Sequence, residues 1–269
     1  MSTGSPSGRF WPEVGRLLAL VLVCALSLQL WFLLRIATMA VIAPASTSFQ
    51  RSEALRLLGE ESEFRWSQEW ADAEQLSKHL RRAVIASEDA GFANHPGVEW
   101  EAIEAALSRN EKAEARAERL QAQQAKRAAQ ASSKGGGNAA PAKKIEPKVV
   151  GGSTITQQLA KNLFLSGERT LARKGQEMIL AFMLEGLLDK QRILTLYLNH
   201  VEFGAGIFGA EAAAQHYFRS TAAKLSAEQA ARLAVMLPAP KLRQRQPYSP
   251  FMNSRTATIV ARMSAVELP

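Results

Sequence analysis

The sequence predicts a mostly α-helical domain that carries one transmembrane helix near its N-terminus. Residues 17–34 form an uncharged run of eighteen mostly apolar residues, about the length that crosses the hydrocarbon core of a bilayer. Beyond that run, apolar residues recur in stretches that are too long for strands. No long alternation of apolar and polar residues indicates a sheet, so helices are expected throughout the domain.

The N-terminal apolar run favours an uncleaved anchor. A cleaved signal peptide is the alternative, because Ala43-Pro44-Ala45 has the small-x-small form of a cleavage site. The uncharged run, however, is longer than the usual hydrophobic region of a signal peptide. We therefore expect a cytoplasmic tail at residues 1–16, a transmembrane anchor at 17–45 and one domain at 46–269. Arginines flank the run on both sides, so charge alone does not set its orientation.

The net charge of +8 is concentrated in one segment. Residues 109–148 hold ten Lys or Arg and only four Asp or Glu, a distribution that argues against a nucleic-acid-binding surface. The segment begins with high helical propensity but offers almost no apolar face, and it then becomes rich in glycine. We expect a basic low-complexity insertion at 111–148, partly helical and partly disordered. It would act as a spacer, or it would attract anionic lipid headgroups or another polyanion.

Two helices of the domain can be placed from local signals. Residues 170–189 are nearly all apolar after Glu177, which predicts a central buried helix. Ser226 and Gln229 have the spacing of a capping box, and Pro238 follows the apolar run after them. This pattern predicts a helix that begins after Ser226 and ends before the proline.

Residues 151–162 combine paired glycines, hydroxyl and amide side chains and one lysine. The glycines allow the backbone to approach a ligand, and Ser153 or Thr154 could cap the helix that follows. The free N–H groups at the start of that helix would favour an anion. No Gly-Lys-Ser/Thr ends the segment, so it is not a phosphate-binding P-loop. An anion site and a purely structural helix start are both compatible with the pattern.

Two acidic sites could carry chemistry. Glu88 and Asp89 follow the apolar residues 83–86, where a buried helix would meet a loop, and partial burial there would raise a carboxyl pKa toward that of a general base. Arg173 and Glu177 lie one helical turn apart on the same face. Taken alone, the first site could be a helix-capping acid and the second an ordinary surface ion pair.

The order of the motifs along the chain is more specific than any one of them. Glu88-Asp89-x-x-Phe92-x-x-His95-x-Gly97 is followed by the segment 151–162, by Arg173-Lys174-x-x-Glu177, by Ile193-Leu194-x-x-Tyr197-x-Asn199 and by Gly209-x-Glu211. This series resembles the peptidoglycan glycosyltransferase family, the lipid II polymerases related to the glycosyltransferase domain of class A penicillin-binding proteins. The chain lacks the Ser-x-x-Lys and Lys-Thr-Gly motifs of the bifunctional relatives, so it resembles the monofunctional branch.

The resemblance implies a lysozyme-like, two-lobed glycosyltransferase domain at 46–269, interrupted by the insertion. The family transfers a growing glycan from undecaprenyl diphosphate to the 4-hydroxyl of an incoming lipid II, with inversion at the anomeric carbon and release of undecaprenyl diphosphate. The resemblance implies that Glu88 is the general base. Glu177 is a second catalytic group, whose role is to orient Arg173, to carry a proton or to help bind a divalent cation.

The same resemblance implies roles for the remaining site residues. The cations that bind the diphosphate are Lys161, Arg169, Arg173 and Lys174. Uncharged hydrogen bonds to the same site come from Ser153, Thr154, Gln158 and Asn162. Asp89, Phe92 and His95 are supports rather than reactants.

The predicted enzyme requires no cofactor, although a divalent cation at the diphosphate is left open, and no metal site is predicted. Its expected partners are lipid II, the growing glycan strand, the membrane and proteins of cell division or cell-wall synthesis, with no nucleic acid. We expect a single-pass protein of the bacterial inner membrane with its catalytic domain on the periplasmic side.

Two other functions compete with the polymerase. A lysozyme-type lytic enzyme acting on peptidoglycan would share the helical fold and the glutamate but would not need a cationic diphosphate site. A non-catalytic, membrane-tethered scaffold would not need intact acidic and basic motifs.

Overall fold

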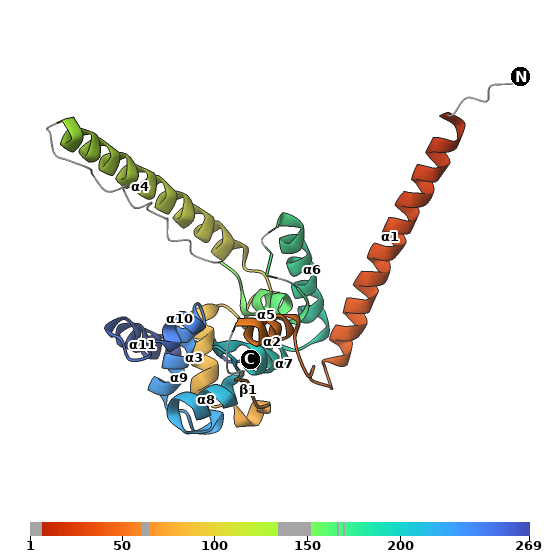
Figure 1. Ribbon diagram of the computed structural model, residues 1–269. Helices are drawn as coiled ribbons and strands as arrows, with labels where there is room; N and C mark the ends of the chain where they lie inside the picture. Colours follow the sequence, from red (N-terminus) through yellow and green to blue (C-terminus); the bar gives the residue numbers. More distant parts are fainter. Residues whose placement is uncertain (1–6, 61–64, 134–151, 166, 169) are drawn as a thin grey trace, which may run out of the picture. The chain divides into compact units, whose positions relative to one another are not determined.

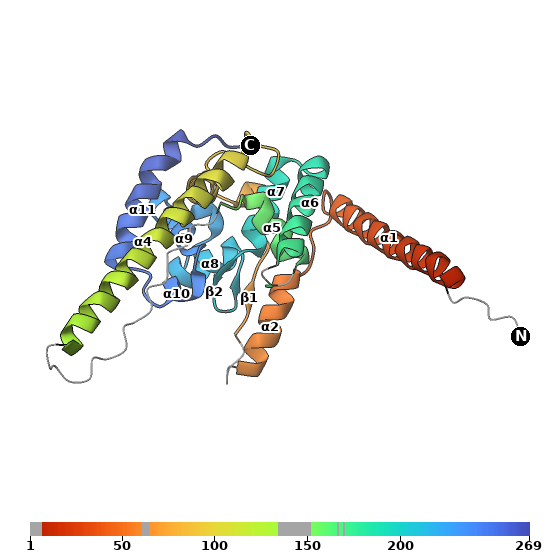
Figure 2. The same cartoon turned by 90° about the horizontal axis from the view of Figure 1, so that it is seen from above.

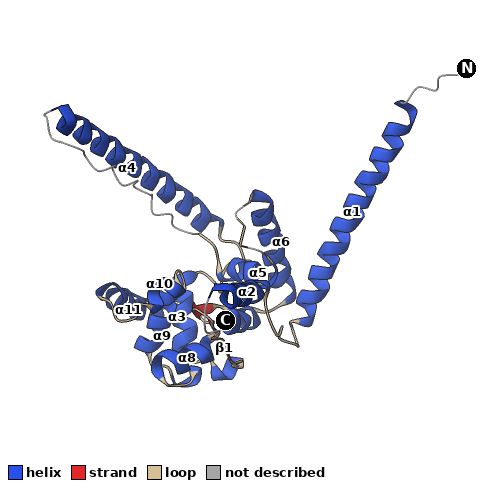
Figure 3. Cartoon of the chain, viewed as in Figure 1, coloured by secondary structure: helices blue, strands red, loops and turns tan. Residues whose placement is uncertain are grey.

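The computed structural model describes residues 7–60, 65–133, 152–165, 167–168 and 170–269. It divides into two compact units, one formed by Met1–Gly97 with Ile155–Pro269 and the other by Val98–Thr154. Helices dominate both units (Figure 3). This agrees with the helical fold class expected from the sequence.

The N-terminal helix α1 (Ser7–Thr38) covers residues 17–38 of the predicted anchor 17–45. Among the described helices, α1 has the length and composition to cross a membrane, with a mean hydropathy of 2.6 in its most apolar window. Its leucines and valines from Leu17 to Leu30 are at least half exposed. The helix ends at Thr38, earlier than the expected boundary at residue 45, and Ile36 and Met39 are buried in the core of the first unit.

A small sheet was not expected from the sequence. Its strands are β1 (Ser67–Gln68), β2 (Glu202–Gly204) and β3 (Ile207–Phe208), in the order β1-β3-β2. β3 is parallel to β1 and antiparallel to β2. Gly206 makes the turn possible, because its φ is +68° and a Cβ atom there would lie 2.0 Å from the carbonyl oxygen of Arg65. Strands of two or three residues are too short to show a two-residue period.

One group of helices in the first unit includes α3, whose last residue is Glu88. α3 (Lys78–Glu88) packs on α9 (Ala227–Met236), which packs on α11 (Pro250–Arg262), and α10 (Pro240–Gln244) lies beside β2. The predicted capping box of Ser226 and Gln229 is present at the start of α9. The predicted end before Pro238 is confirmed as well.

A second group in the same unit carries residues 155–162 of the glycine-led segment 151–162 and the motif Arg173-Lys174-x-x-Glu177. It contains α5 (Ile155–Phe164), α6 (Leu171–Leu187), α7 (Lys190–His200) and α8 (Ala210–Phe218). α5 packs against both α6 and α7, as the view in Figure 2 shows. The remaining described helices of the first unit are α2 (Ser48–Glu60) and the 3₁₀ turns Ala73–Gln75, Ala222–Lys224 and Met263–Ala265.

The prediction that residues 170–189 form a central buried helix is wrong in part. α6 is a helix, but Ile179 and Phe182 are each 45% exposed. Gln176 of α6 exchanges two hydrogen bonds with Gln29 of α1, at 2.9 and 3.1 Å. α6 therefore lies against the candidate membrane helix, where apolar side chains need not be buried in protein.

The second unit contains α4 (Trp100–Ser133), a single continuous helix. Within the expected insertion, the side chains of residues 111–126 are exposed apart from Ala113 and Ala117. This agrees with a segment that has little apolar face to bury. Residues 134–148 of the insertion lie outside the described residues, so the disorder expected there stays a prediction.

Candidate active site

Glu88 is the last residue of α3, at the point where the buried helix gives way to the loop of the first motif. Gln158 of α5 donates a hydrogen bond to its Oε2 at 3.1 Å, and the Ser87 hydroxyl donates to Oε1 at 3.3 Å. Burial raises the pKa of the Glu88 carboxyl, the two hydrogen bonds lower it, and the nearby Asp89 raises it further. A carboxyl with a raised pKa is suited to accept a proton from a hydroxyl group.

Gln158 is held in place by a second contact. The hydroxyl of Tyr197 on α7 donates to Gln158 Oε1 at 2.9 Å. This bond commits the amide oxygen, so the amide nitrogen faces Glu88. Tyr197 is 1% exposed, and burial, followed by the charges of Glu88 and Asp89, raises the pKa of its hydroxyl well above the usual value. Tyr197 therefore stays a donor and fixes the orientation of Gln158.

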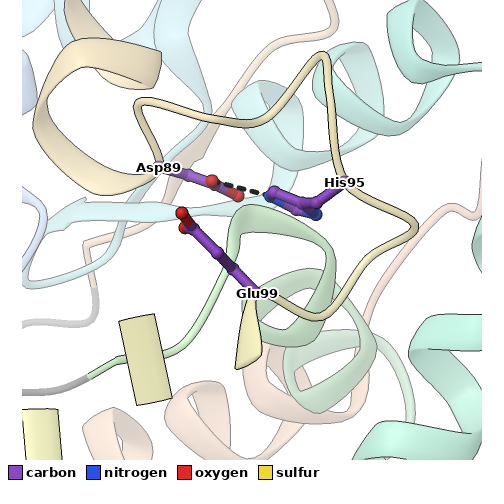
Figure 4. Close-up of side chains that lie close together, drawn as sticks. All are labelled: Asp89, His95 and Glu99. Carbon is purple, nitrogen blue, oxygen red and sulfur yellow. Dashed lines mark hydrogen bonds and ion pairs between the residues drawn. The ribbon is translucent and has the colours of Figure 1, made fainter. Parts of the chain in front are cut away.

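Asp89 does not act on substrate from where it lies, because both of its oxygens bind protein. Oδ2 accepts the backbone N–H of Ile155, the first residue of α5, at 3.0 Å. Oδ1 binds His95 Nε2 at 2.8 Å (Figure 4). His95 Nδ1 accepts the backbone N–H of Gly97 at 3.1 Å, so the proton of the neutral ring lies on Nε2. Asp89 thus joins the first motif to the start of α5.

Gly97 is needed at this position for two reasons. Its φ is +87°, and a Cβ atom there would lie 2.6 Å from Cγ of Glu185. A side chain would strain the backbone and push Glu185 away. Such a change would displace the Gly97 N–H group and remove the donor that fixes the His95 ring through Nδ1.

A second network holds the loop of the first motif against three helices. Lys190 of α7 donates to the carbonyl oxygen of His95 at 2.6 Å and to Glu185 of α6 at 2.9 Å. Its ammonium group also lies 4.5 Å from the centre of the Phe92 ring. Glu185 accepts the hydroxyl of Thr156 on α5 at 2.5 Å. Phe92 is fully buried.

The motif Arg173-Lys174-x-x-Glu177 forms a compact cluster of charge at the start of α6. Arg173 donates to Glu177 Oε2 at 2.8 Å, and Lys174 donates to Glu177 Oε1. Glu177 is 3% exposed, so this is not an ordinary surface ion pair. Lys161 of α5 belongs to the same cluster. Desolvation by the surrounding protein atoms is the largest effect and lowers the pKa of the Lys161 ammonium group. The charge of Glu177 raises that pKa, and the charges of Arg173 and Lys174 lower it. Arg173 and Lys174 bind the Glu177 carboxylate directly and Lys161 interacts with it electrostatically, so positive charge exceeds negative charge and the cluster attracts an anion.

Helix α5 connects this cluster to the candidate base. Gln158 binds Glu88, and Lys161 lies three residues further along the same helix, on the same face. Three residues of α-helix advance by about 4.5 Å. Gln158, which binds Glu88, and Lys161 of the cationic cluster therefore lie about one turn apart on one side of α5, in the first unit.

The comparison with protein families decides the identity of the chain. It matches the family described as Transglycosylase over residues 56–135 and 135–264. The chain belongs to this family. The resemblance carried by the motifs is thereby confirmed.

Relatives of this transglycosylase match it over nearly their whole length. Proteins named biosynthetic peptidoglycan transglycosylase are 44% identical in Bordetella pertussis, 46% in Burkholderia thailandensis and 42% in Herminiimonas arsenicoxydans. The alignments cover 93%, 91% and 97% of this chain. They cover 91%, 83% and 96% of the relatives.

Not every predicted site residue of the transglycosylase is placed by the structure. Arg169 lies outside the described residues. Ser153 and Thr154 belong to the second unit, while Ile155 begins the part of the first unit that follows it. The N–H group of Ile155 is bound by Asp89, so Asp89 caps the start of α5. Asn162 is on α5 and 8% exposed.

Sequence reasoning missed the groups that support the transglycosylase site. Tyr197 was part of a recognised motif but was given no role, and Lys190, Glu185 and Thr156 were not singled out. Each acts through a partner that is distant in sequence, so no local spacing points to it. The one available signal was the placement of Lys190 at the start of an apolar helix, where a lysine near the helix N-terminus is unfavourable unless it has a partner.

Proposed function

We propose that this transglycosylase polymerises lipid II into glycan strands, with inversion at the anomeric carbon and release of undecaprenyl diphosphate. The observation that carries the proposal is the placement of a carboxyl with a raised pKa and a cluster of cations along one side of α5. A base and an anion site next to one another are what transfer from a diphosphate-linked sugar requires. The names of the relatives support peptidoglycan as the product.

In this mechanism Glu88 removes the proton from the 4-hydroxyl of the acceptor sugar. The hydroxyl oxygen attacks the anomeric carbon of the growing strand from the face opposite the diphosphate, which inverts the configuration without a covalent sugar–enzyme intermediate. Gln158 keeps the carboxylate oriented through its 3.1 Å hydrogen bond, and Tyr197 keeps Gln158 oriented. Glu88 is therefore the one residue that exchanges a proton with substrate in the forward step.

The cationic cluster stabilises the departing diphosphate. Negative charge accumulates on the leaving group as the glycosidic bond breaks, so Lys161 and Arg173 stabilise the transition state more than the ground state. Glu177 has both carboxylate oxygens bound to cations. We assign it the role of orienting Arg173 and Lys174, which fits its contacts better than carrying a proton or binding a metal ion. Asn162 and, from the second unit, Ser153 and Thr154 are proposed donors to the same anion, as is Arg169.

The two competing functions explain less of the structure. A lytic enzyme of lysozyme type would use Glu88 but would leave a cluster of three cations around one buried carboxylate without purpose. A scaffold would have no use for a carboxyl with a raised pKa. The polymerase accounts for both features and for the apolar helix α1, because its donor and acceptor are membrane lipids.

We propose further that the chain is a single-pass protein of the bacterial inner membrane with its catalytic domain in the periplasm. No cofactor is needed for the mechanism, and the addition of EDTA should leave turnover within about twofold, since cations of the protein already neutralise the leaving group. Partners among cell-division or cell-wall synthesis proteins are compatible with this location.

Polymerisation of labelled lipid II by the purified full-length chain tests the proposal. Gel analysis should show glycan strands, and these should disappear when a phosphoglycolipid inhibitor that mimics the donor is added. The variant Glu88→Gln should remain folded but lose about 10²- to 10⁴-fold in turnover. Glu267→Gln, at an exposed position, is the matched control and should be fully active. Near-normal turnover of Glu88→Gln, or cleavage of finished strands in place of synthesis, would refute the proposal.

A further inference from the structure

A cavity of about 390 Å³ lies where α1 ends and α2 begins. Its walls come from the last turns of α1, from the first turn of α2 and from the end of α5. Its volume falls in the range of pockets that bind small molecules. Neither Glu88 nor any residue of the cationic cluster lines the cavity, so it is separate from the proposed site of chemistry.

The polar side of the cavity is cationic. Arg35 and Arg51 line it, and none of its lining residues is Asp or Glu. Among the described residues, no side chain binds the guanidinium group of Arg35. The guanidinium of Arg51 is positioned by the hydroxyls of Ser46 and Ser48, each at 3.1 Å, which leave its charge uncompensated. Two arginines without a carboxylate form a binding site for an anion, and guanidinium groups can grip two oxygens of a phosphate at once.

The start of α2 adds to this positive potential. Ser48 is the first residue of this thirteen-residue helix, and Arg51 lies in its first turn. Thr47 and Gln50 cap the helix reciprocally, at 3.1 and 2.9 Å, so its geometry is well defined. The positive end of the helix dipole therefore faces the same cavity as the two arginines.

The other side of the cavity is apolar and adjoins the candidate membrane helix. Trp31 and Phe32 of α1 line it, and Phe32 makes an edge-to-face contact with Phe164 at 5.2 Å. Arg35 is the first charged residue after the uncharged run 17–34, so in a membrane it would lie at the level of the headgroups. Trp31 is 54% exposed at the same level, as aromatic residues of the membrane interface are.

We propose that this cavity binds the headgroup of an anionic phospholipid. The lipid phosphate is held between Arg35 and Arg51, the glycerol lies against Trp31 and Phe32, and the acyl chains follow the exposed apolar surface of α1. The proposal requires that α1 spans the membrane, but it does not depend on the chemistry at Glu88. A lipid held at this corner fixes the end of α1, and with it the first unit, at a defined height on the bilayer surface.

Native mass spectrometry of the full-length chain in detergent tests the proposal, with added phosphatidylglycerol or phosphatidylcholine as probes. Wild type should retain one phosphatidylglycerol more tightly than phosphatidylcholine. The double variant Arg35→Gln/Arg51→Gln should bind phosphatidylglycerol about thirtyfold more weakly, since each arginine near a membrane surface contributes about one factor of five in affinity. Arg35→Gln alone, which removes no hydrogen bond within the protein, should show an intermediate loss.

The matched control is Arg255→Gln/Arg262→Gln, which removes the same charge from exposed positions of α11 and should leave lipid binding unchanged. Equal phosphatidylglycerol binding by wild type and by the Arg35/Arg51 double variant would overturn the proposal. So would an equal loss in the control, which would assign the effect to net charge. Displacement of the lipid by millimolar inorganic phosphate would assign the cavity to a soluble anion instead. Because lipid retention is measured without turnover, failure here is distinguishable from failure of the polymerase proposal.

Discussion

Two replacements of Asp89 measure how firmly the first motif is joined to α5. Asp89 is 5% exposed, and its two oxygens bind the Ile155 N–H group at 3.0 Å and His95 Nε2 at 2.8 Å. Alanine leaves both donors without an acceptor. An unsatisfied buried donor costs about 1–3 kcal/mol, so Asp89→Ala should lower the free energy of unfolding by about 2–6 kcal/mol.

Asparagine should cost about half as much. Its amide has a single oxygen, so it can accept from Ile155 or from His95 but not from both, and its NH₂ group then faces a donor. His95 cannot remove the conflict by moving its proton to Nδ1, because that atom accepts the Gly97 N–H at 3.1 Å. One donor is therefore left unsatisfied, and Asp89→Asn should cost about 1–3 kcal/mol.

The assay is denaturant unfolding of the detergent-solubilised chain, followed by circular dichroism. Asp72→Asn is the control, because Asp72 stands at the N-cap position of a helical turn but is exposed, and asparagine is accepted at that position about as well as aspartate. It should change the free energy of unfolding by less than about 0.5 kcal/mol. If Asp89→Asn were as mild as Asp72→Asn, the proposed junction between the first motif and α5 would be refuted.

Three further predictions concern charge and proton binding. Glu177→Gln should lower kcat about tenfold to a hundredfold with little change in KM, because Arg173 loses its orientation rather than its charge; an unchanged kcat would contradict this. Gln158→Met should shift the acidic limb of the pH–rate profile to higher pH, since burial raises the pKa of Glu88 and the lost hydrogen bond no longer lowers it; a shift to lower pH would contradict it. Burial raises the pKa of Glu202 to about 7. Between about pH 4.5 and pH 7 the native protein therefore holds a proton that the unfolded protein releases, so the free energy of unfolding should fall as the pH rises through this range. Glu202→Gln should remove about 3 kcal/mol of that fall, measured as the difference in unfolding free energy between pH 4.5 and pH 7.5.

The sequence predicts those parts of the site whose residues lie close to one another along the chain. The position of Glu88 at a helix end follows from the apolar residues before it and the glycine-rich loop after it, and the pairing of Arg173 with Glu177 follows from their separation by one helical turn. The family resemblance then assigned roles to these residues. Partial burial was predicted for Glu88, but the burial of Glu177 was not, because it depends on the helices that pack against α6.

The parts that sequence does not predict depend on long-range contacts. Ser153 and Thr154 have the residue types of helix caps, yet the side chain that binds the first N–H of α5 is Asp89, 66 residues earlier. The apolar composition of α6 predicted burial, but packing beside α1 leaves part of its surface exposed. Propensity and periodicity describe a segment, whereas these outcomes are set by the segment's neighbours.

The proposed mechanism requires that Glu88 and the cationic cluster act at the two sides of one sugar–diphosphate bond. An experimental structure of the full-length chain with a non-hydrolysable, diphosphate-linked donor analogue and an acceptor tests this directly. We predict diphosphate oxygens within hydrogen-bonding distance of Lys161 and Arg173, and the acceptor 4-hydroxyl within hydrogen-bonding distance of the Glu88 carboxylate. A diphosphate bound away from Lys161 and Arg173, or an acceptor hydroxyl out of reach of Glu88, would contradict the account.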